Sequence, residues 1–340
     1  MSKRKQNGIF FILLVLILIL VSQLFWHLAR NHMQNLQERN QSVMGIQAEK
    51  ENSIDVLVLG DSEGYSAISP VQLWQSNGVP SYICAQPAQK IQETYYMLKT
   101  ACRTQNPKLV VIETNVLFRG SKKWTDDAQT ALAETGRYYL PVLRYHNLWK
   151  SLFQSNQTET DSYKGFIVRE KVDSCDKESA KSYMDKSDKK QEMPQVVSIY
   201  MDQILKLCRD NDIKVLLVSV PSTMNHSYKR HNTLVEYAEK ENLDYVDLNT
   251  KTEELGINWD TDSRDKGDHL NISGAQKVTK YLGEYLKEHY ELADKREDDA
   301  YQDWNSIVAQ YNSDTTAKIK KIRGTGKDMY NSKENISLTE

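Results

Sequence analysis

Residues 55–66 read DVLVLGDSEGYS, and this stretch decides the fold prediction. Residues 56–60 form a short, continuous apolar run of the kind found in parallel strands that helices cover on both faces. The run ends at Gly60 and Asp61, which places Ser62 at the carboxyl end of the predicted strand. Gly, Asp and Ser also commonly form a turn that caps a following helix. Taken alone, the tripeptide therefore favours a capping turn over a catalytic one.

Four further runs have the length and composition of strands: PSYICAQ (80–86), KLVVIETN (108–115), KVLLVSVP (214–221) and DYVDL (244–248). Between them, apolar residues recur at three- and four-residue spacing, which indicates helices near 91–102, 197–208 and 275–285. Strands that alternate with helices predict an α/β fold, with a five-stranded parallel sheet between two helical layers. Because functional groups gather at the carboxyl ends of such strands, we expect Ser62, Asn115 and His269 at one edge.

The N-terminus departs from this soluble pattern. Residues 8–29 contain no Lys, Arg, Asp or Glu, and a helix of that length spans roughly 30 Å, the thickness of bilayer hydrocarbon. Lys3, Arg4 and Lys5 precede it, so the positive-inside rule leaves residues 1–7 in the cytoplasm and the bulk of the chain outside. A cleaved signal peptide is the alternative, but we find no small-x-small cleavage site after the apolar run. We therefore favour a single-pass anchor over residues 8–30 in the cell membrane.

The rest of the chain divides by composition into a polar, Gln-rich stalk (31–53), the α/β domain (54–290) with an insertion (118–192), and a tail (291–340) that begins as a polar helix and is expected to be disordered from Gly324. The insertion is too long for an ordinary connection, and we expect it to cover the site or to bind substrate. Its aromatic residues, among them Tyr145 and Trp149, are favoured as a small core over a sugar-binding groove.

The composition argues against nucleic-acid binding, and the spacing of Cys and His argues against a metal site. The charge is nearly balanced, with 44 Lys and Arg against 46 Asp and Glu, so no basic surface marks a nucleic-acid binder. Cys84, Cys102 and Cys208 lie in apolar runs without CxxC spacing and are favoured as free buried thiols. His226 and His231, five residues apart, are interpreted as surface residues rather than metal ligands. We expect no cofactor and no metal.

His269 lies in GDHLNISGA (267–275), immediately before the last strongly periodic helix. A histidine that faces a strand-end cleft can take the proton from a serine hydroxyl, provided that a carboxylate orients its other ring nitrogen. A surface histidine near a helix start is common, and that interpretation is favoured for this motif alone. Both preferences are reversed only when the two motifs are taken together, through the family resemblance that they carry.

The two motifs together resemble the SGNH (GDSL-type) hydrolase superfamily, and more narrowly its membrane-anchored branch of lipoteichoic-acid D-alanine transfer proteins and envelope O-acetylation proteins. The resemblance covers the five strand-like runs and implies a flavodoxin-like sheet. It implies Ser62 as the nucleophile, whose own N–H helps to stabilise an oxyanion, and His269 as the general base. The family's acid stands three residues before the histidine, where this chain has Lys266. Asp265 and Asp268 flank that position, so either completes a triad, or a Ser-His dyad operates.

The same resemblance implies an oxyanion role for Asn115, with an ordinary turn residue as the equally favoured alternative. The family's oxyanion glycine after the second strand has no clear counterpart here. In its place the segment AQPAQK offers the N–H of Gln86, Ala88 or Gln89.

The leading expectation is a membrane-anchored, extracytoplasmic serine acyltransferase that acts on a cell-envelope polysaccharide or teichoic-acid-like polymer. The acyl group is acetyl, D-alanyl or another small group, carried by Ser62. An anchored carbohydrate esterase or deacetylase is one alternative, and a non-catalytic partner of a multi-pass membrane acyltransferase is the other. The anchor favours transfer, because it holds the site near a donor delivered through the membrane.

Overall fold

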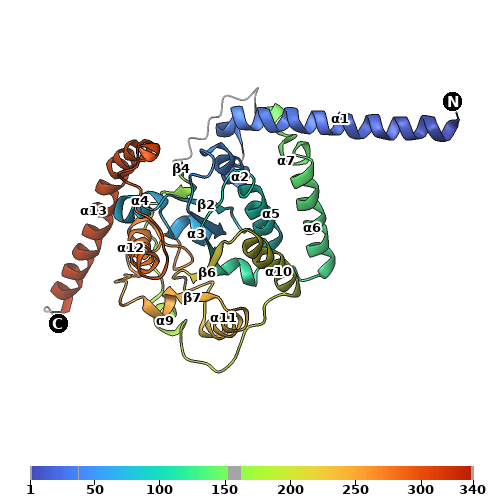
Figure 1. Ribbon diagram of the computed structural model, residues 1–340. Coiled ribbons are helices and arrows are strands. Elements are labelled where there is room, and N and C mark those ends of the chain that lie inside the picture. The colour runs from blue at the N-terminus through green and yellow to red at the C-terminus, as the bar shows by residue number, and fades with distance from the viewer. Residues whose placement is uncertain (1, 37, 152–161, 338–340) are drawn as a thin grey trace.

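A five-stranded, fully parallel sheet forms the centre of the molecule, in a computed structural model that describes residues 2–36, 38–151 and 162–337 (Figure 1). The strands, in the spatial order β2-β1-β3-β6-β7, are β1 (Val56–Gly60), β2 (Ser81–Ala85), β3 (Leu109–Glu113), β6 (Lys214–Ser219) and β7 (Asp244–Asp247). Each falls within one of the five predicted runs, so the α/β class and the parallel sheet are confirmed. The order is that of a doubly wound, flavodoxin-like sheet.

Helices cover both faces of this sheet, which gives the predicted three layers (Figure 1). Successive residues of a strand point to opposite faces, so Leu57 and Leu59 pack into one layer and Val56 and Val58 into the other. The first layer contains α2 (Glu38–Ala48), α5 (Ile91–Ala101), α10 (Gln195–Asp210) and α11 (Tyr228–Glu241). The second contains α3 (Ser62–Ala67), α4 (Pro70–Asn77), α12 (Ile272–His289) and α13 (Asp303–Ser337).

The candidate site lies at the carboxyl ends of β1, β3 and β6. The strand order reverses between β1 and β3, and open α/β sheets bind ligands at such a switch point. Ser62 follows β1, and Asn115 lies in the 3-10 helix η2 (Thr114–Phe118) directly after β3. Two short 3-10 helices lie farther along the chain, η3 (Leu248–Lys251) after β7 and η4 (Asp299–Tyr301) before α13.

The predicted insertion contains α6 (Trp124–Tyr139), α7 (Val142–Tyr145), α8 (Leu148–Ser151), the antiparallel pair β4 (Ser162–Tyr163) and β5 (Phe166–Ile167), and α9 (Lys177–Ser182), with residues 152–161 outside the described part. The turn between β4 and β5 covers an edge of the main sheet, because the N–H of Ile83 in β2 donates to Lys164 O at 2.9 Å. Tyr145 is buried, as expected of a core residue, whereas Trp149 is exposed.

The N-terminal helix α1 (Lys3–Asn31) is long and apolar enough to cross a membrane, and no other helix of the described residues is. Such a helix fits a single-pass anchor or a signal sequence. The segment after it does not form the predicted stalk. The 3-10 helix η1 (Met33–Asn35) leads into α2, whose Val43, Met44 and Ile46 are buried, and Ser42 Oγ donates to the carbonyl of Ala85 in β2 at 2.8 Å. A short apolar stripe is enough to pack a helix against a domain. The polar composition of residues 31–53 therefore led to the wrong prediction of a stalk.

The C-terminal helix α13 also differs in part from the expectation. Its first turns pack on the domain, where Trp304 stacks on Trp74 and Tyr311 is buried. The helix then continues past Gly324 to Ser337, over a stretch that we expected to be disordered. This stretch contains no proline, and a glycine within a helix costs only about 1 kcal/mol.

All four cysteines lie in the described part of the chain and are free thiols, as predicted for Cys84, Cys102 and Cys208. Cys84 and Cys208 are buried, and Cys102 is partly so.

Candidate functional site

Ser62 lies at the junction of β1 and α3. Asp61 is the N-cap of α3, and its Oδ1 accepts the N–H of Glu63 at 2.9 Å. Gly60 is required before it, because a Cβ there would stand 2.7 Å from the Cβ of Glu113 on the neighbouring strand. Gly-Asp-Ser is thus a helix-capping turn, and the same turn brings Ser62 to the strand end. As the first residue of α3, Ser62 has an N–H that the hydrogen bonds of its own helix do not use.

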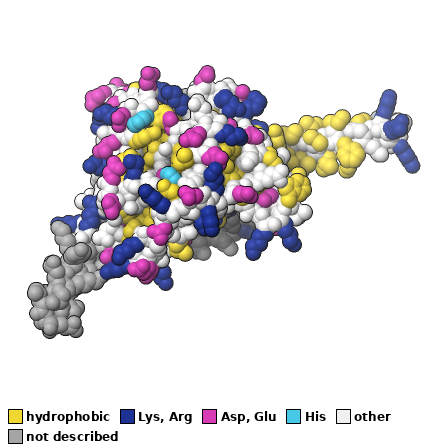
Figure 2. Space-filling view, turned by 90° about the horizontal axis from the view of Figure 1, so that it is seen from below, with side chains coloured by type: hydrophobic (Ala, Val, Ile, Leu, Met, Phe, Trp, Pro, Cys, Tyr) yellow, Lys and Arg dark blue, Asp and Glu magenta, His cyan; other side chains and the backbone are white. Residues whose placement is uncertain are grey.

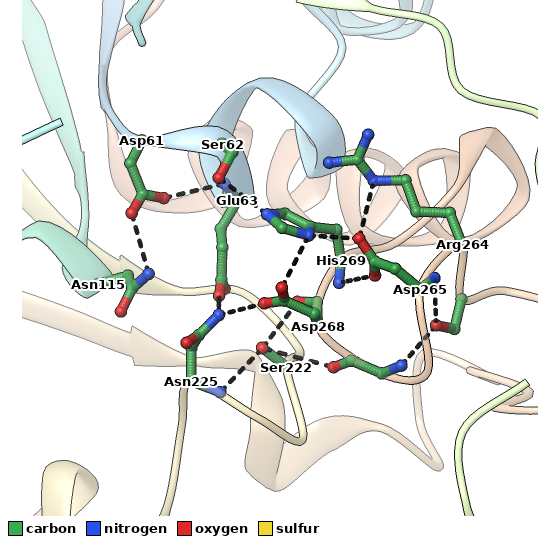
Figure 3. A network of polar contacts seen from close by, with 12 residues as sticks. Asp61, Ser62, Glu63, Asn115, Ser222, Asn225, Arg264, Asp265, Asp268 and His269 are labelled. Carbon is green, nitrogen blue, oxygen red and sulfur yellow. Dashed lines mark hydrogen bonds and ion pairs between the residues drawn. The ribbon is translucent and has the colours of Figure 1, made fainter. Parts of the chain in front are cut away.

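The side chains of Ser62, His269 and Asp265 form one line of hydrogen bonds (Figure 3). His269 Nδ1 lies 2.7 Å from Asp265 Oδ2, and His269 Nε2 lies 2.8 Å from Ser62 Oγ. An ionised carboxylate only accepts hydrogen bonds, so Nδ1 carries the ring proton and Nε2 accepts from the serine hydroxyl. This is the tautomer that a general base requires. The fold therefore brings two residues 207 positions apart into hydrogen-bonding distance.

A left-handed turn places the acid at this histidine. Lys266 stands three residues before His269 and has a φ of +64°, and Gly267 follows with a φ of +95°. These two positive φ values curl the chain so that the carboxylate of Asp265 returns to the histidine. There it accepts both the ring Nδ1–H and the backbone N–H of His269, the latter at 2.6 Å. The turn thus places an acid at the ring although it stands one residue farther from His269 than the resemblance implies.

Asp268 takes a different position beside the same ring. Its Oδ2 lies 3.4 Å from His269 Nδ1, against 2.7 Å for Asp265, and its Oδ1 accepts a short hydrogen bond from Asn225 Nδ2. Burial opposes the ionisation of Asp265, but the hydrogen bonds from His269 outweigh it and hold the pKa of Asp265 below its usual value. Of the two candidate acids, Asp265 is therefore the better placed to orient the ring.

Asp61 links the turn at Ser62 to the end of β3. It is fully buried, and its Oδ2 accepts from Asn115 Nδ2 at 2.9 Å (Figure 3). The same oxygen accepts from Arg119 Nε in a short ion pair. Asn115 Oδ1 in turn accepts from Arg230 at 3.0 Å. The Asn115 side chain thus joins Asp61, after β1, to Arg230 of α11, and its oxyanion role stays a prediction.

The other oxyanion candidates lie in the segment after β2, where one of their backbone N–H groups already donates a hydrogen bond. The N–H of Gln89 donates to Gln86 O at 3.2 Å. Ala88 has a φ of +50°, a left-handed conformation that glycine would adopt without strain. An oxyanion donor from Gln86, Ala88 or Gln89 stays a prediction.

Two buried acids lie behind the nucleophile, and the sequence did not single them out. Glu63 follows Ser62, Glu113 ends β3, and both are almost completely buried. Burial raises the pKa of Glu63 well above its usual value, and the neighbouring Glu113 adds to this; burial and then the charge of Asp61 do the same for Glu113. Glu63 accepts from Asn225 Nδ2 at 2.5 Å, whereas Glu113 Oε2 has no hydrogen-bond partner among the described residues.

The loop after β6 holds the histidine loop in place. Ser222 Oγ donates to Asp268 O at 2.8 Å and accepts the N–H of Asn225 at 3.2 Å. Asn225 Nδ2 bridges the carboxylates of Glu63 and Asp268 (Figure 3). Sequence reasoning missed both residues, although polar residues directly after the strand-like run KVLLVSVP are a usable signal.

The prediction of two surface histidines is wrong for His226. It is buried, and Asp247 Oδ2 accepts from His226 Nε2 at 3.0 Å and from His231 Nδ1 at 2.8 Å. Burial opposes the ionisation of Asp247, but these two hydrogen bonds outweigh it and hold its pKa well below the usual value. Both rings reach Asp247 because His226 lies before the start of α11, so the two histidines need not share a face of that helix. Asn249 connects Asp247 to the N–H of Ser222, which ties this cluster to the loop after β6.

Among the described residues, one group of side chains has the atom types and the spacing of metal ligands. Asp265, Asp268 and His269 offer ligand atoms that lie within 4.8 Å of one another. The Nδ1 that faces both acids already donates to Asp265, and Nε2 faces Ser62. This donor set fits a proton relay better than a metal site, and the relay can activate a serine hydroxyl for attack on an acyl carbon.

We compared the chain with known families, curated proteins and solved structures. No protein-family model and no curated protein matches the chain. Among solved structures it is similar to a GDSL-like lipase from Bacteroides thetaiotaomicron, with 13% identity, a TM-score of 0.38, and 74% of this chain and 97% of that chain covered. It is also similar to the lipase/acylhydrolase from Enterococcus faecalis, with 14% identity, a TM-score of 0.34, and coverage of 71% and 99%. We take no activity from similarities of this size.

Proposed function

We propose that this protein is a membrane-anchored, extracytoplasmic serine acyltransferase of the SGNH type that acts on a cell-envelope polymer. One observation carries the proposal: Ser62, His269 and Asp265 are joined by hydrogen bonds of 2.8 and 2.7 Å at the carboxyl edge of a parallel sheet. The order of the two motifs along the chain, serine first and histidine last, supports the superfamily.

The reaction proceeds in two balanced steps. Ser62 Oγ attacks the donor's acyl carbon while its proton moves to His269 Nε2, and that proton then leaves with the donor's leaving group. The acyl group is now an ester of Ser62. In the second step a polymer hydroxyl gives its proton to His269 and attacks the acyl carbon, and Ser62 Oγ departs and regains the proton. Asp265 stays ionised throughout and stabilises the charged imidazole ring.

The anchor and the acceptor distinguish this reaction from hydrolysis. α1 holds the site at the membrane, where a multi-pass partner delivers a small acyl group such as acetyl or D-alanyl. With water as the acceptor, the same residues make an anchored esterase or deacetylase. The third possibility is a non-catalytic partner of a membrane acyltransferase, in which Ser62 carries no acyl group.

One complementation experiment separates the three. We expect deletion of the gene to lower the O-acyl ester content of the envelope, wild-type protein to restore it, and Ser62→Ala to fail although it reaches the membrane in equal amount. A rise in ester content on deletion would indicate the esterase. Full restoration by Ser62→Ala would indicate the non-catalytic partner and would overturn the proposed reaction.

A further inference from the structure

The exposed apolar side chains of the domain are concentrated in one place. Outside α1, seven large apolar residues of the described chain are exposed, and five of them lie within α6–α8: Trp124, Leu132, Tyr139, Leu143 and Trp149, each 49–74% exposed. We call these five residues the apolar edge. Soluble domains seldom gather exposed aromatic and aliphatic side chains in this way, so the concentration calls for a partner.

Helix α6 buries two acids and exposes several large apolar side chains. Asp127 pairs with Lys90 and Glu134 with Arg144 and with Arg137 of the same helix, while Ala131 and Tyr138 pack against the first layer. Its outward residues include Trp124, Leu132 and Tyr139, which are eight and seven residues apart and therefore lie within an arc of about 80°. A helix that buries charge and exposes apolar groups is suited to an apolar environment outside the domain.

The apolar edge lies where α1 meets the domain. Figure 1 shows α6 and α7 at the edge from which α1 projects, with α6 running crosswise to α1. Tyr145 and Leu148 of the insertion pack with Ala29 of α1 in one buried cluster, which Phe25 and Trp26 extend. Hydrophobic side chains cover the projecting length of α1, and basic residues mark its tip (Figure 2).

The length of α1 determines how deep this edge lies. A helix needs about 20 residues to cross the hydrocarbon of a bilayer, so a span that begins at Gly8 ends near His27. The continuous run of exposed apolar residues ends at Leu20. Beyond it Ser22 and Ala29 are buried, although Leu24 between them is exposed. The last turns of the span are therefore at the level of α7, and the domain edge beside them must enter the interfacial layer of the membrane.

We infer that the apolar edge is a membrane-contact surface, which lies in the boundary between lipid headgroups and acyl chains and holds the Ser62 site at a fixed height over the bilayer. Trp and Tyr favour this boundary because their rings are apolar and their N–H or O–H groups are polar. Lys122 and Lys123, both exposed just before α6, suit the anionic headgroups of such a surface. The inference rests on the anchoring that the proposed function includes.

The test measures lipid contact residue by residue. The full chain, carrying Cys102→Ser, receives one new cysteine at Leu132, at Leu16 in the middle of α1, or at Lys280 on α12 far from α1, and each is labelled with an environment-sensitive fluorophore. The unsubstituted Cys102→Ser chain gives the labelling background. The proteins are reconstituted into vesicles of phosphatidylcholine and phosphatidylglycerol, without any other protein, and quenched by lipids that carry a nitroxide.

We expect blue-shifted emission at Leu132 and quenching at least roughly twofold stronger than at Lys280, as for a group in the interfacial layer. Quenching at Leu16 but not at Leu132 would overturn the membrane-contact surface and leave the anchor intact, which would then assign the apolar edge to a protein partner. Absence of quenching at Leu16 as well would overturn both the anchor and the inference.

Discussion

At the scale of single residues, the activation of Ser62 depends on which acid orients the ring of His269. Asp265 accepts two hydrogen bonds from His269, through the ring and through the backbone N–H, whereas Asp268 is held by Asn225. Both acids have the same side chain, so the difference between them is geometric. The sequence left this choice open, because the position that the family uses is Lys266.

Asp265→Asn should therefore impair the reaction far more than Asp268→Asn. An amide at position 265 can donate to Nδ1 and stabilise the wrong tautomer, and we expect acylation of Ser62 to slow on the order of 10³–10⁴-fold. For Asp268→Asn we expect a loss of less than about tenfold, because Asn still accepts from Asn225. The measurement is the rate of covalent labelling at Ser62, with the thermal midpoint as the folding control. Equal rates in the two variants would contradict the assignment of Asp265.

A second residue-scale prediction concerns Glu113, whose pKa burial and Asp61 raise. A carboxyl with a raised folded-state pKa favours folding below its unfolded pKa of about 4.3 and costs stability as the pH rises from there toward the folded pKa. Glu113→Gln has no charge to bury. We therefore expect the variant to gain at least about 1 kcal/mol of unfolding free energy at neutral pH, and the gain to vanish near pH 4.

The measurement is thermal unfolding in detergent across this pH range, with Glu236→Gln on the exposed face of α11 as the control. A gain that does not depend on pH, or a loss at neutral pH, would show that Glu113 is not a buried acid of raised pKa.

At the scale of elements, the loop of residues 263–270 delivers the histidine and its acid together. Ser263 pairs with Leu270 across its base, and Ser263 Oγ accepts the N–H of Gly267 at 2.6 Å. Gly267 packs so closely that a Cβ would collide with Thr223 Oγ1 and Cys175 Sγ. Gly256 is also left-handed, with a φ of +66°, but a Cβ there would meet nothing within 4 Å.

These two glycines make a matched pair. Gly256→Ala should cost about 1 kcal/mol of stability through backbone strain alone and leave the labelling rate of Ser62 unchanged. Gly267→Ala adds the collision to the same strain, so we expect a loss of about 2–4 kcal/mol and slower labelling, because the loop that carries Asp265 and His269 must shift. Denaturant unfolding and labelling kinetics check both. Equal effects of the two substitutions would contradict the tight packing of this loop.

The comparison of sequence with structure is sharpest at this scale. The five strands were predictable because buried parallel strands are continuous apolar runs, and the position of Ser62 follows from the end of β1. His269 lies well beyond the end of β7 and was found by its motif before the last periodic helix. The left-handed turn at Lys266 and Gly267 was not predictable, because a positive φ at lysine has no sequence signature. Asn225 was missed because its partners, Glu63 and Asp268, are distant in the chain.

At the scale of the whole molecule, α1 and the domain are closely joined. The predicted stalk is a helix packed on β2, and the base of α1 is buried against the insertion. The polar composition of residues 31–53 hid this, because the contacts of Val43 and Ile46 are made with the first helical layer and not within the segment. This close packing of α1 on the domain supports the proposal of a site that is held at the membrane.

The central claim is that Ser62 is an activated nucleophile. The most direct test is covalent labelling of the full-length protein in detergent with a fluorophosphonate, followed by mass mapping of the modified peptide. We predict one adduct, on Ser62, which is lost in Ser62→Ala and strongly slowed in His269→Ala, while Ser66→Ala in the same helix labels like the wild type. A wild-type protein that stays unlabelled, or an adduct that persists in Ser62→Ala, would contradict the account.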